Sequence, residues 1–147
     1  MPDPASVYIA GDVDPDRVSG DGVTIHPGCR ISGSETVISA GVSLGAEGPV
    51  TITNVRLGVG ASIAAGYAVK SVLLEGASLG LGAHVRDACL LEEQSGGAHT
   101  VGLKQTILLP FVTLGSLINF CDCLMSGGTS RSDHSEVGSS YIHFNFT

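Results

Sequence analysis

A six-residue repeat of aliphatic residues runs through most of this chain. Glycine often follows the aliphatic residue, as in Leu57-Gly58 and Leu79-Gly80, and glycine accepts the tight backbone of a corner. An α-helix would need apolar residues at three- and four-residue spacing instead, and 21 glycines argue further against it. The repeat therefore predicts short strands alternating with corners, and little or no α-helix. Its members are Leu57, Ile63, Val69, Leu73, Leu79, Val85, Leu91, Val101, Ile107, Leu114 and Phe120.

Three such six-residue repeat units are enough to close one coil, and stacked coils bring the aliphatic side chains into one continuous core. The expected fold is all-β, a single-stranded left-handed parallel β-helix of about seven coils. One domain, residues 1–147, accounts for the length, and 43% hydrophobic residues suit a long, thin core. The repeat starts at Ile25 but slips near Leu44. We therefore expect an irregular capping coil over residues 1–50 and regular coils over residues 51–147.

Two interruptions of the repeat are long enough to predict loops. The first follows Leu91 and predicts a protruding loop near residues 92–100. The second follows Phe120 and predicts a loop near residues 124–136. A solenoid accepts insertions at its corners, so functional groups are expected to gather in these loops.

Charge and cysteine content exclude several kinds of partner. The chain has 7 basic and 14 acidic residues, and its basic residues are scattered, so nothing would displace counterions from a nucleic-acid backbone. No secretory leader is recognisable, and no apolar run approaches the roughly 18 residues that would span a bilayer. The four cysteines do not suggest a secreted disulfide framework. We therefore expect a cytoplasmic protein that binds neither nucleic acid nor membranes.

The last third of the chain is the richest in polar functional groups. His134 follows Asp133 and lies near Arg131, a combination suited to a general base beside an anion clamp. The alternative is a solvated, glycine-flanked loop. His143 occupies an aliphatic position of the repeat, which indicates either a local change of register or a partly buried imidazole with a hydrogen-bond partner.

Two cysteines, Cys121 and Cys123, share one face of a predicted strand. With a nearby histidine they could form a zinc site, but C-x-C alone is a weak signal because structural zinc favours paired C-x₂-C spacing. We therefore predict no metal site.

The end of the chain carries a more specific resemblance. The segments Leu114-Gly-Ser-Leu-Ile-Asn-Phe-Cys-Asp122 and Glu136-Val-Gly-Ser-Ser-Tyr-Ile-His-Phe-Asn-Phe-Thr147 resemble the acetyltransferase half of the bacterial bifunctional UDP-N-acetylglucosamine pyrophosphorylase/glucosamine-1-phosphate acetyltransferase. More broadly, the chain resembles the hexapeptide-repeat superfamily of trimeric, acyltransferase-like left-handed β-helices. It also resembles stand-alone β-helix proteins described as related to UDP-N-acetylglucosamine pyrophosphorylases.

The resemblance implies roles for individual residues. Asn145 matches an asparagine that contacts the sugar substrate in the family, whereas the family's catalytic histidine falls on Asp122. An aspartate is ordinarily a poor base for a sugar amine at neutral pH, and His134 is the candidate replacement. The candidate catalytic residues are therefore His134 and Asp122, and the candidate substrate-binding residues are Asn145, Arg131, Asn119 and His143.

Two hypotheses for function follow. The leading one is a sugar-nucleotide-linked transferase of the hexapeptide class, transferring an acyl or nucleotidyl group to or from an N-acetylglucosamine-type sugar phosphate. The resemblance implies a homotrimer with its site at a subunit seam, and acetyl-CoA as the donor in acyl transfer. The glycine-rich pyrophosphorylase signature is absent, and the chain stops at Thr147 where the family continues, which indicates truncation. The second hypothesis is a non-catalytic oligomerisation or ligand-sensing scaffold, or an inactive fragment.

Overall fold

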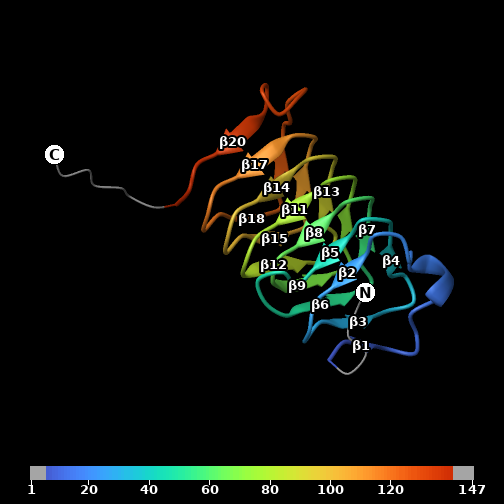
Figure 1. Ribbon diagram of the computed structural model, residues 1–147. Helices are drawn as coiled ribbons and strands as arrows, with labels where there is room; N and C mark the ends of the chain where they lie inside the picture. Colours follow the sequence, from blue (N-terminus) through green and yellow to red (C-terminus); the bar gives the residue numbers. More distant parts are fainter. Residues whose placement is uncertain (1–5, 141–147) are drawn as a thin grey trace.

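The protein is a solenoid of stacked coils in a computed structural model that describes residues 6–140 (Figure 1). Strands fall into three parallel sheets, here called A, B and C, and from β3 onward the chain visits them in that order in each coil. Each strand pairs with the strand one coil away, as β9 pairs with both β6 and β12. The helical content of residues 6–140 is one 3-10 turn, Pro15–Arg17, near the N-terminal end. The predicted all-β parallel β-helix is therefore confirmed.

The strands are short, and their bounds are as follows. Sheet A contains β1 (Tyr8–Ile9), β3 (Arg30–Ser32), β6 (Val50–Thr53), β9 (Gly66–Val69), β12 (Ala83–Arg86), β15 (Gly102–Lys104) and β18 (Asn119–Cys121). Sheet B contains β4 (Val37–Ile38), β7 (Arg56–Leu57), β10 (Val72–Leu73), β13 (Leu90–Leu91), β16 (Ile107–Leu108) and β19 (Leu124–Met125). Sheet C contains β2 (Thr24–Ile25), β5 (Ser43–Leu44), β8 (Ser62–Ile63), β11 (Ser78–Leu79), β14 (Gly96–Gly97), β17 (Val112–Leu114) and β20 (Ser135–Val137).

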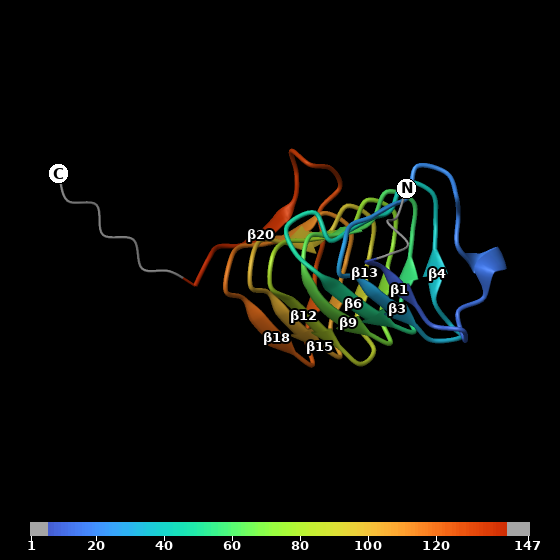
Figure 2. The same ribbon diagram turned by 60° about the horizontal axis from the view of Figure 1, so that its bottom comes forward.

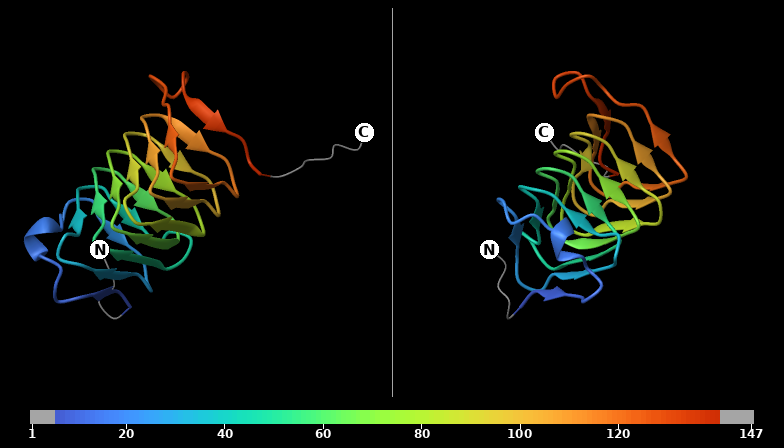
Figure 3. Two further views of the ribbon diagram at one scale, coloured as in Figure 1. Left: turned by 180° about the vertical axis from the view of Figure 1, so that it is seen from behind. Right: turned by 90° about the vertical axis from the view of Figure 1, so that its right-hand side faces the viewer.

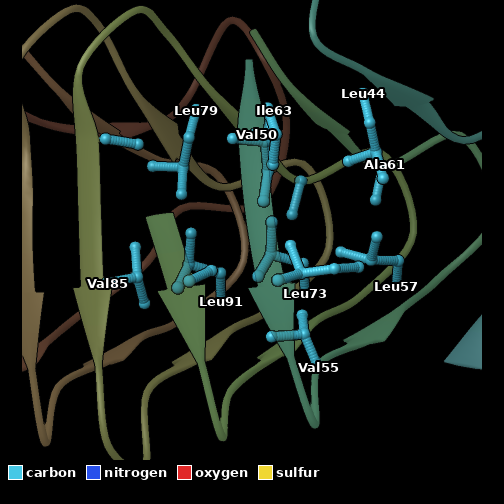
Figure 4. Packing of buried hydrophobic residues seen from close by; sticks show 14 of the residues in the cluster. Leu44, Val50, Val55, Leu57, Ala61, Ile63, Leu73, Leu79, Val85 and Leu91 are labelled. Carbon is cyan, nitrogen blue, oxygen red and sulfur yellow. The ribbon is translucent and has the colours of Figure 1, made fainter. Parts of the chain in front are cut away.

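A single hydrophobic core runs along the axis of the solenoid, inside the three sheets. Its aliphatic side chains are stacked coil on coil, which fully removes most of them from water. Burying one such side chain stabilises the fold by about 1.5–3 kcal/mol, so the repeat supplies most of the driving force for folding. Figure 4 shows two of these stacks. One contains Leu57, Leu73 and Leu91, and the other contains Leu44, Ile63 and Leu79.

Three members of the predicted repeat, Val69, Val101 and Ile107, do not occupy the inward strand positions, and Val101 precedes β15 at a corner. On sheet A the inward residue of β9 is Ala68 rather than Val69, and on sheet B that of β16 is Leu108, while Ile107 is 39% exposed. The reason is that several sides of the solenoid are five residues long instead of six. Their corners turn on one residue with a left-handed backbone, such as Lys70 (φ 46°).

The prediction of a protruding loop near residues 92–100 is wrong. Gly96 and Gly97 form β14, which pairs in register with β11 and β17 of sheet C. Gly97 therefore holds the repeat position without an aliphatic side chain. A Cβ on Gly97 would lie 2.8 Å from Cγ2 of Val101, so the buried Val101 side chain fills the space that a side chain at position 97 would need.

An enlarged corner does lie between β19 and β20. Residues 126–134 connect these two strands and project beyond the outline of the other coils (Figure 2). The ends of the predicted loop are strand, because Leu124–Met125 pairs with β16 and Ser135–Val137 pairs with β17.

The two ends of the described chain lie at opposite ends of the stack (Figure 3). At the N-terminal end the Asp14 carboxylate accepts a hydrogen bond from the Asp16 amide at 2.9 Å and begins the 3-10 turn. No helix within residues 6–140 is long and apolar enough to cross a membrane.

Candidate functional site

The outer face of sheet A carries a groove near the C-terminal end of the solenoid. Tyr67, His84, Gly102 and Asn119 are register partners on successive strands and point away from the core. Because Gly102 has no side chain, a hollow of about 400 Å³ opens between His84 and Asn119. Its lining residues are Gly82, His84, Arg86, Thr100, Val101, Gly102, Leu103, Leu117 and Asn119.

Two cations lie side by side at the edge of this groove. Arg86 and Lys104 are register partners on β12 and β15, and Arg86 lines the hollow. Strands in a sheet are about 4.8 Å apart, and like charges directly opposite one another are destabilising. Within the described residues, neither side chain makes an ion pair or hydrogen bond that would offset this repulsion. The pair therefore creates a positive edge on a chain whose net charge is -7.

The aromatic ring of Tyr67 stands edge-on to the His84 imidazole at the other side of the groove. The ring centroids are 5.5 Å apart and the planes are inclined by 84°. Edge-to-face contacts of this kind are favourable, so Tyr67 restricts the orientation of His84. The groove thus combines the Arg86 guanidinium, an oriented imidazole and the Asn119 amide, and Lys104 lies in register beside Arg86.

A second, smaller hollow lies at the enlarged corner between sheets B and C. It measures about 170 Å³ and brings Arg131 and His134 together with Gln94, Phe111 and Thr113. Arg131 donates a hydrogen bond from Nη2 to Oε1 of Gln94, and His134 Nε2 lies 3.0 Å from Oε2 of Glu136.

Local hydrogen bonds shape this enlarged corner. Thr129 donates from Oγ1 to the Asp133 carboxylate at 2.6 Å and from its amide to the Asp133 carbonyl at 2.8 Å. The amide of Gly128 donates to the Pro110 carbonyl of the preceding coil at 2.9 Å. Asp133 therefore holds the turn, and it is His134 that reaches the hollow.

Comparison with known proteins links this solenoid to one named protein. No protein family model matches the chain. It is similar to the bifunctional protein GlmU of Corynebacterium aurimucosum, with 26% identity over 144 residues, and to that of Corynebacterium glutamicum, with 28% identity over 144 residues. The chain is a hexapeptide-repeat β-helix distantly related to GlmU. Each alignment covers 98% of this chain, which spans 27% of the length of each GlmU relative.

The site residues predicted from the sequence do not form one cluster within residues 6–140. Asn119 lies in the groove on sheet A, and Asp122 follows the same strand at the corner between sheets A and B. Arg131 and His134 lie at the corner between sheets B and C. The other two substrate-binding candidates, His143 and Asn145, lie outside the described residues.

Asp122 forms a backbone corner of the solenoid, and this accounts for an aspartate at its position. Its backbone is left-handed (φ 55°), and its amide donates to the Lys104 carbonyl of the preceding coil at 3.0 Å. Asn54, Lys70 and Gln105 are left-handed at the same corner of earlier coils. Aspartate and asparagine tolerate this conformation better than most residues, so an aspartate suits the corner whatever else it does.

Sequence reasoning missed His84, Arg86 and Lys104. They lie in regular coils rather than in an interruption of the repeat, and nothing in their local sequence marks them. The signal that finds them is the register, because His84 pairs with Gly102, 18 residues further along the chain, and Gly102 pairs with Asn119, another 17 residues further. Without the pairing of β12 with β15 and β18, these side chains could not be assigned to one surface.

The four cysteines differ in accessibility. Cys29 and Cys89 are buried, whereas Cys121 is exposed and Cys123 is partly exposed. Burial raises the pKa of the Cys89 thiol above its ordinary value. No three metal-ligating side chains of residues 6–140 gather in a group that could hold an ion.

Proposed function

We propose that this protein is a transferase of the hexapeptide class that binds an N-acetylglucosamine-type sugar phosphate or sugar nucleotide. The relationship to GlmU over 98% of the chain supports the class. The groove on sheet A supports this class of substrate, because it offers a positive edge and uncharged hydrogen-bonding groups side by side. In this proposal the protein acts in the cytoplasm as a homotrimer, with acetyl-CoA as the acyl donor.

The observation that carries the proposal is the Arg86–Lys104 pair beside the Asn119 amide. A phosphate bound between the two cations turns their repulsion into two charge-assisted contacts, and arginine matches phosphate geometry with two parallel hydrogen bonds. The Asn119 amide can both donate to and accept from the hydroxyl or acetamido groups of a sugar. A phosphorylated sugar therefore fits the groove better than an uncharged one.

The apolar outer face of sheet B supports assembly of subunits. Val72, Leu90, Ile107 and Leu124 are register partners on successive strands of this face. Ile107 is 39% and Leu124 is 69% exposed, and a continuous apolar stripe of this kind marks an interaction surface. Arg86 and Lys104 are the outward residues of sheet A nearest to sheet B, so a subunit packed on sheet B would border the groove. This arrangement agrees with a site at a subunit seam.

Arg131 and His134 belong to the proposal as candidates from the sequence. The carboxylate of Glu136 can fix the imidazole with the proton on Nε2, which leaves Nδ1 free to accept one. Asp122 lies at the opposite edge of sheet B from this corner. In a cyclic assembly opposite edges of neighbouring subunits can meet, so Asp122 and His134 could approach each other only across a seam.

The proposal is tested by calorimetric titration of the purified chain with glucosamine 1-phosphate, UDP-N-acetylglucosamine and acetyl-CoA. Saturable binding of the sugar phosphate is expected, and Arg86→Gln and Lys104→Gln should each weaken it by about tenfold or more, since a hydrogen bond to a charged group is worth about 1.5–3 kcal/mol. Arg30→Gln is the matched control, because it removes the same charge from sheet A outside the groove. Equal affinity in all variants would contradict the assignment of the groove.

A second candidate function is a ligand-sensing scaffold. It is favoured by the separation of Asp122 from His134 on different corners of the subunit. Binding of the sugar phosphate with no detectable binding of acetyl-CoA, and no acetyl transfer, would support this candidate over the transferase.

A further inference from the structure

Acyl transfer to an amino sugar needs a base close to the amino group. In glucosamine 1-phosphate the amino group is on the carbon next to the one that carries the phosphate. A phosphate held by Arg86 and Lys104 therefore places the amine close to these cations, and the base must lie in the same part of the groove.

His84 is the titratable side chain that lines this hollow together with Arg86. The two residues belong to β12 and point to the same face, because side chains two positions apart in a strand share a face about 6.6 Å apart. A sugar whose phosphate contacts Arg86 can therefore place its neighbouring amine beside His84, within the same hollow.

The surroundings of His84 leave one side of its ring open to a ligand. Tyr67 of β9 contacts the imidazole edge-on from one side. On the other side β15 offers Gly102 in the register position, so no side chain separates His84 from the groove. A Cβ on Gly102 would lie 2.8 Å from Oδ1 of Asn119, so even a methyl group at position 102 would enter the space between His84 and Asn119.

The second imidazole near a hollow is less suitably placed. His134 lies at the corner between sheets B and C, and its Nε2 is already 3.0 Å from the Glu136 carboxylate. None of the residues that line the groove on sheet A also lines the hollow of His134. Within one subunit His134 therefore does not face the cation pair.

We infer that His84 is the general base that takes a proton from the sugar amine. This inference rests on the proposed transferase function and deepens it. The amine nitrogen attacks the thioester carbonyl of acetyl-CoA as the imidazole accepts its proton. A C–N bond forms, the C–S bond breaks, and the imidazolium returns the proton to the departing thiolate.

The first test compares steady-state acetyl transfer by the full chain and its His84→Gln variant. General-base catalysis contributes about 10²–10⁴-fold, so kcat should fall by this factor while the calorimetric affinity for glucosamine 1-phosphate stays within about twofold. His26→Gln, which changes an imidazole on the far coils, is the control and should behave as the unmodified chain does. Unchanged kcat in His84→Gln, or an equal loss in affinity, would overturn the inference.

A second measurement separates this inference from the proposed function. The imidazole resonance of His84 is followed by NMR during pH titration with glucosamine 1-phosphate and with glucose 1-phosphate, which lacks the amine. The His84 titration midpoint should differ between the two complexes, because only the first ligand brings an amine to the ring. Identical midpoints would refute a contact with the amine even if acetyl transfer occurs. If the chain binds both ligands but transfers no acetyl group, the proposed transferase function is refuted. The comparison of the two midpoints still shows whether His84 contacts the amine.

Discussion

At the scale of single residues, Gly97 and Val101 show how the core compensates for a missing side chain. The repeat position at Gly97 is empty of side-chain atoms, and the fully buried Val101 fills that space from the next corner. The sequence pattern identified Val101 as an aliphatic residue of the core, which is correct. It could not show that Val101 substitutes for position 97, because volume compensation between neighbours leaves no periodic signal.

This packing predicts an interaction between two substitutions. Gly97→Ala should destabilise the fold by about 1–3 kcal/mol, because the added Cβ overlaps Val101 in a filled core. Val101→Ala should also destabilise it by leaving a cavity. The double variant should be more stable than the sum of the two effects predicts, with a coupling of about 0.5–3 kcal/mol. Urea denaturation of the three variants measures this, and simple additivity would contradict the proposed exchange of volume.

At the scale of structural elements, the corners decide which residues face outward. Five-residue sides turn on one left-handed residue, such as Gln105 (φ 47°), whereas the six-residue side from Val85 to Leu91 uses two, Asp87 and Ala88. These are ordinary residues that rarely adopt such a backbone, so the sequence does not reveal where a side is shortened. The fold was predictable because the aliphatic repeat survives such shifts. The groove was not, because one missing residue changes which side chains become neighbours.

The corner at Asp122 provides a test that separates structure from chemistry. Asp122→Asn should change stability by no more than about 0.5 kcal/mol, because asparagine tolerates the left-handed backbone. Asp122→Val should cost about 1–2 kcal/mol, since a branched Cβ clashes in this conformation. Thermal or urea unfolding gives both values. If Asp122→Asn keeps its stability but loses acetyl transfer, Asp122 has a catalytic part as well, as the resemblance to the acetyltransferase half of GlmU implies.

At the scale of the whole molecule, the three faces of the solenoid differ in chemistry. Sheet A carries the groove with its cations, and sheet B carries the apolar stripe. Sheet C presents a row of small polar residues in register, including Ser43, Ser62 and Ser78. A core built from one repeat needs no such differences between faces. In the proposed function these differences correspond to different tasks, with substrate binding assigned to sheet A and subunit contacts to sheet B.

The apolar stripe predicts how the assembly can be broken. Leu124→Glu places a charge at the most exposed position of the stripe, 69% exposed, so the fold should tolerate it while a partner surface should not, because burying an unpaired carboxylate is costly. Ile107→Glu on the neighbouring strand should act in the same way. Light scattering coupled to size-exclusion chromatography should show a trimer for the unmodified chain and monomers for both variants. Leu81→Glu, at a 47% exposed leucine away from sheet B, is the matched control and should remain trimeric. If the sheet B variants stay trimeric, the subunits meet on another face and the apolar stripe of sheet B does not form their seam.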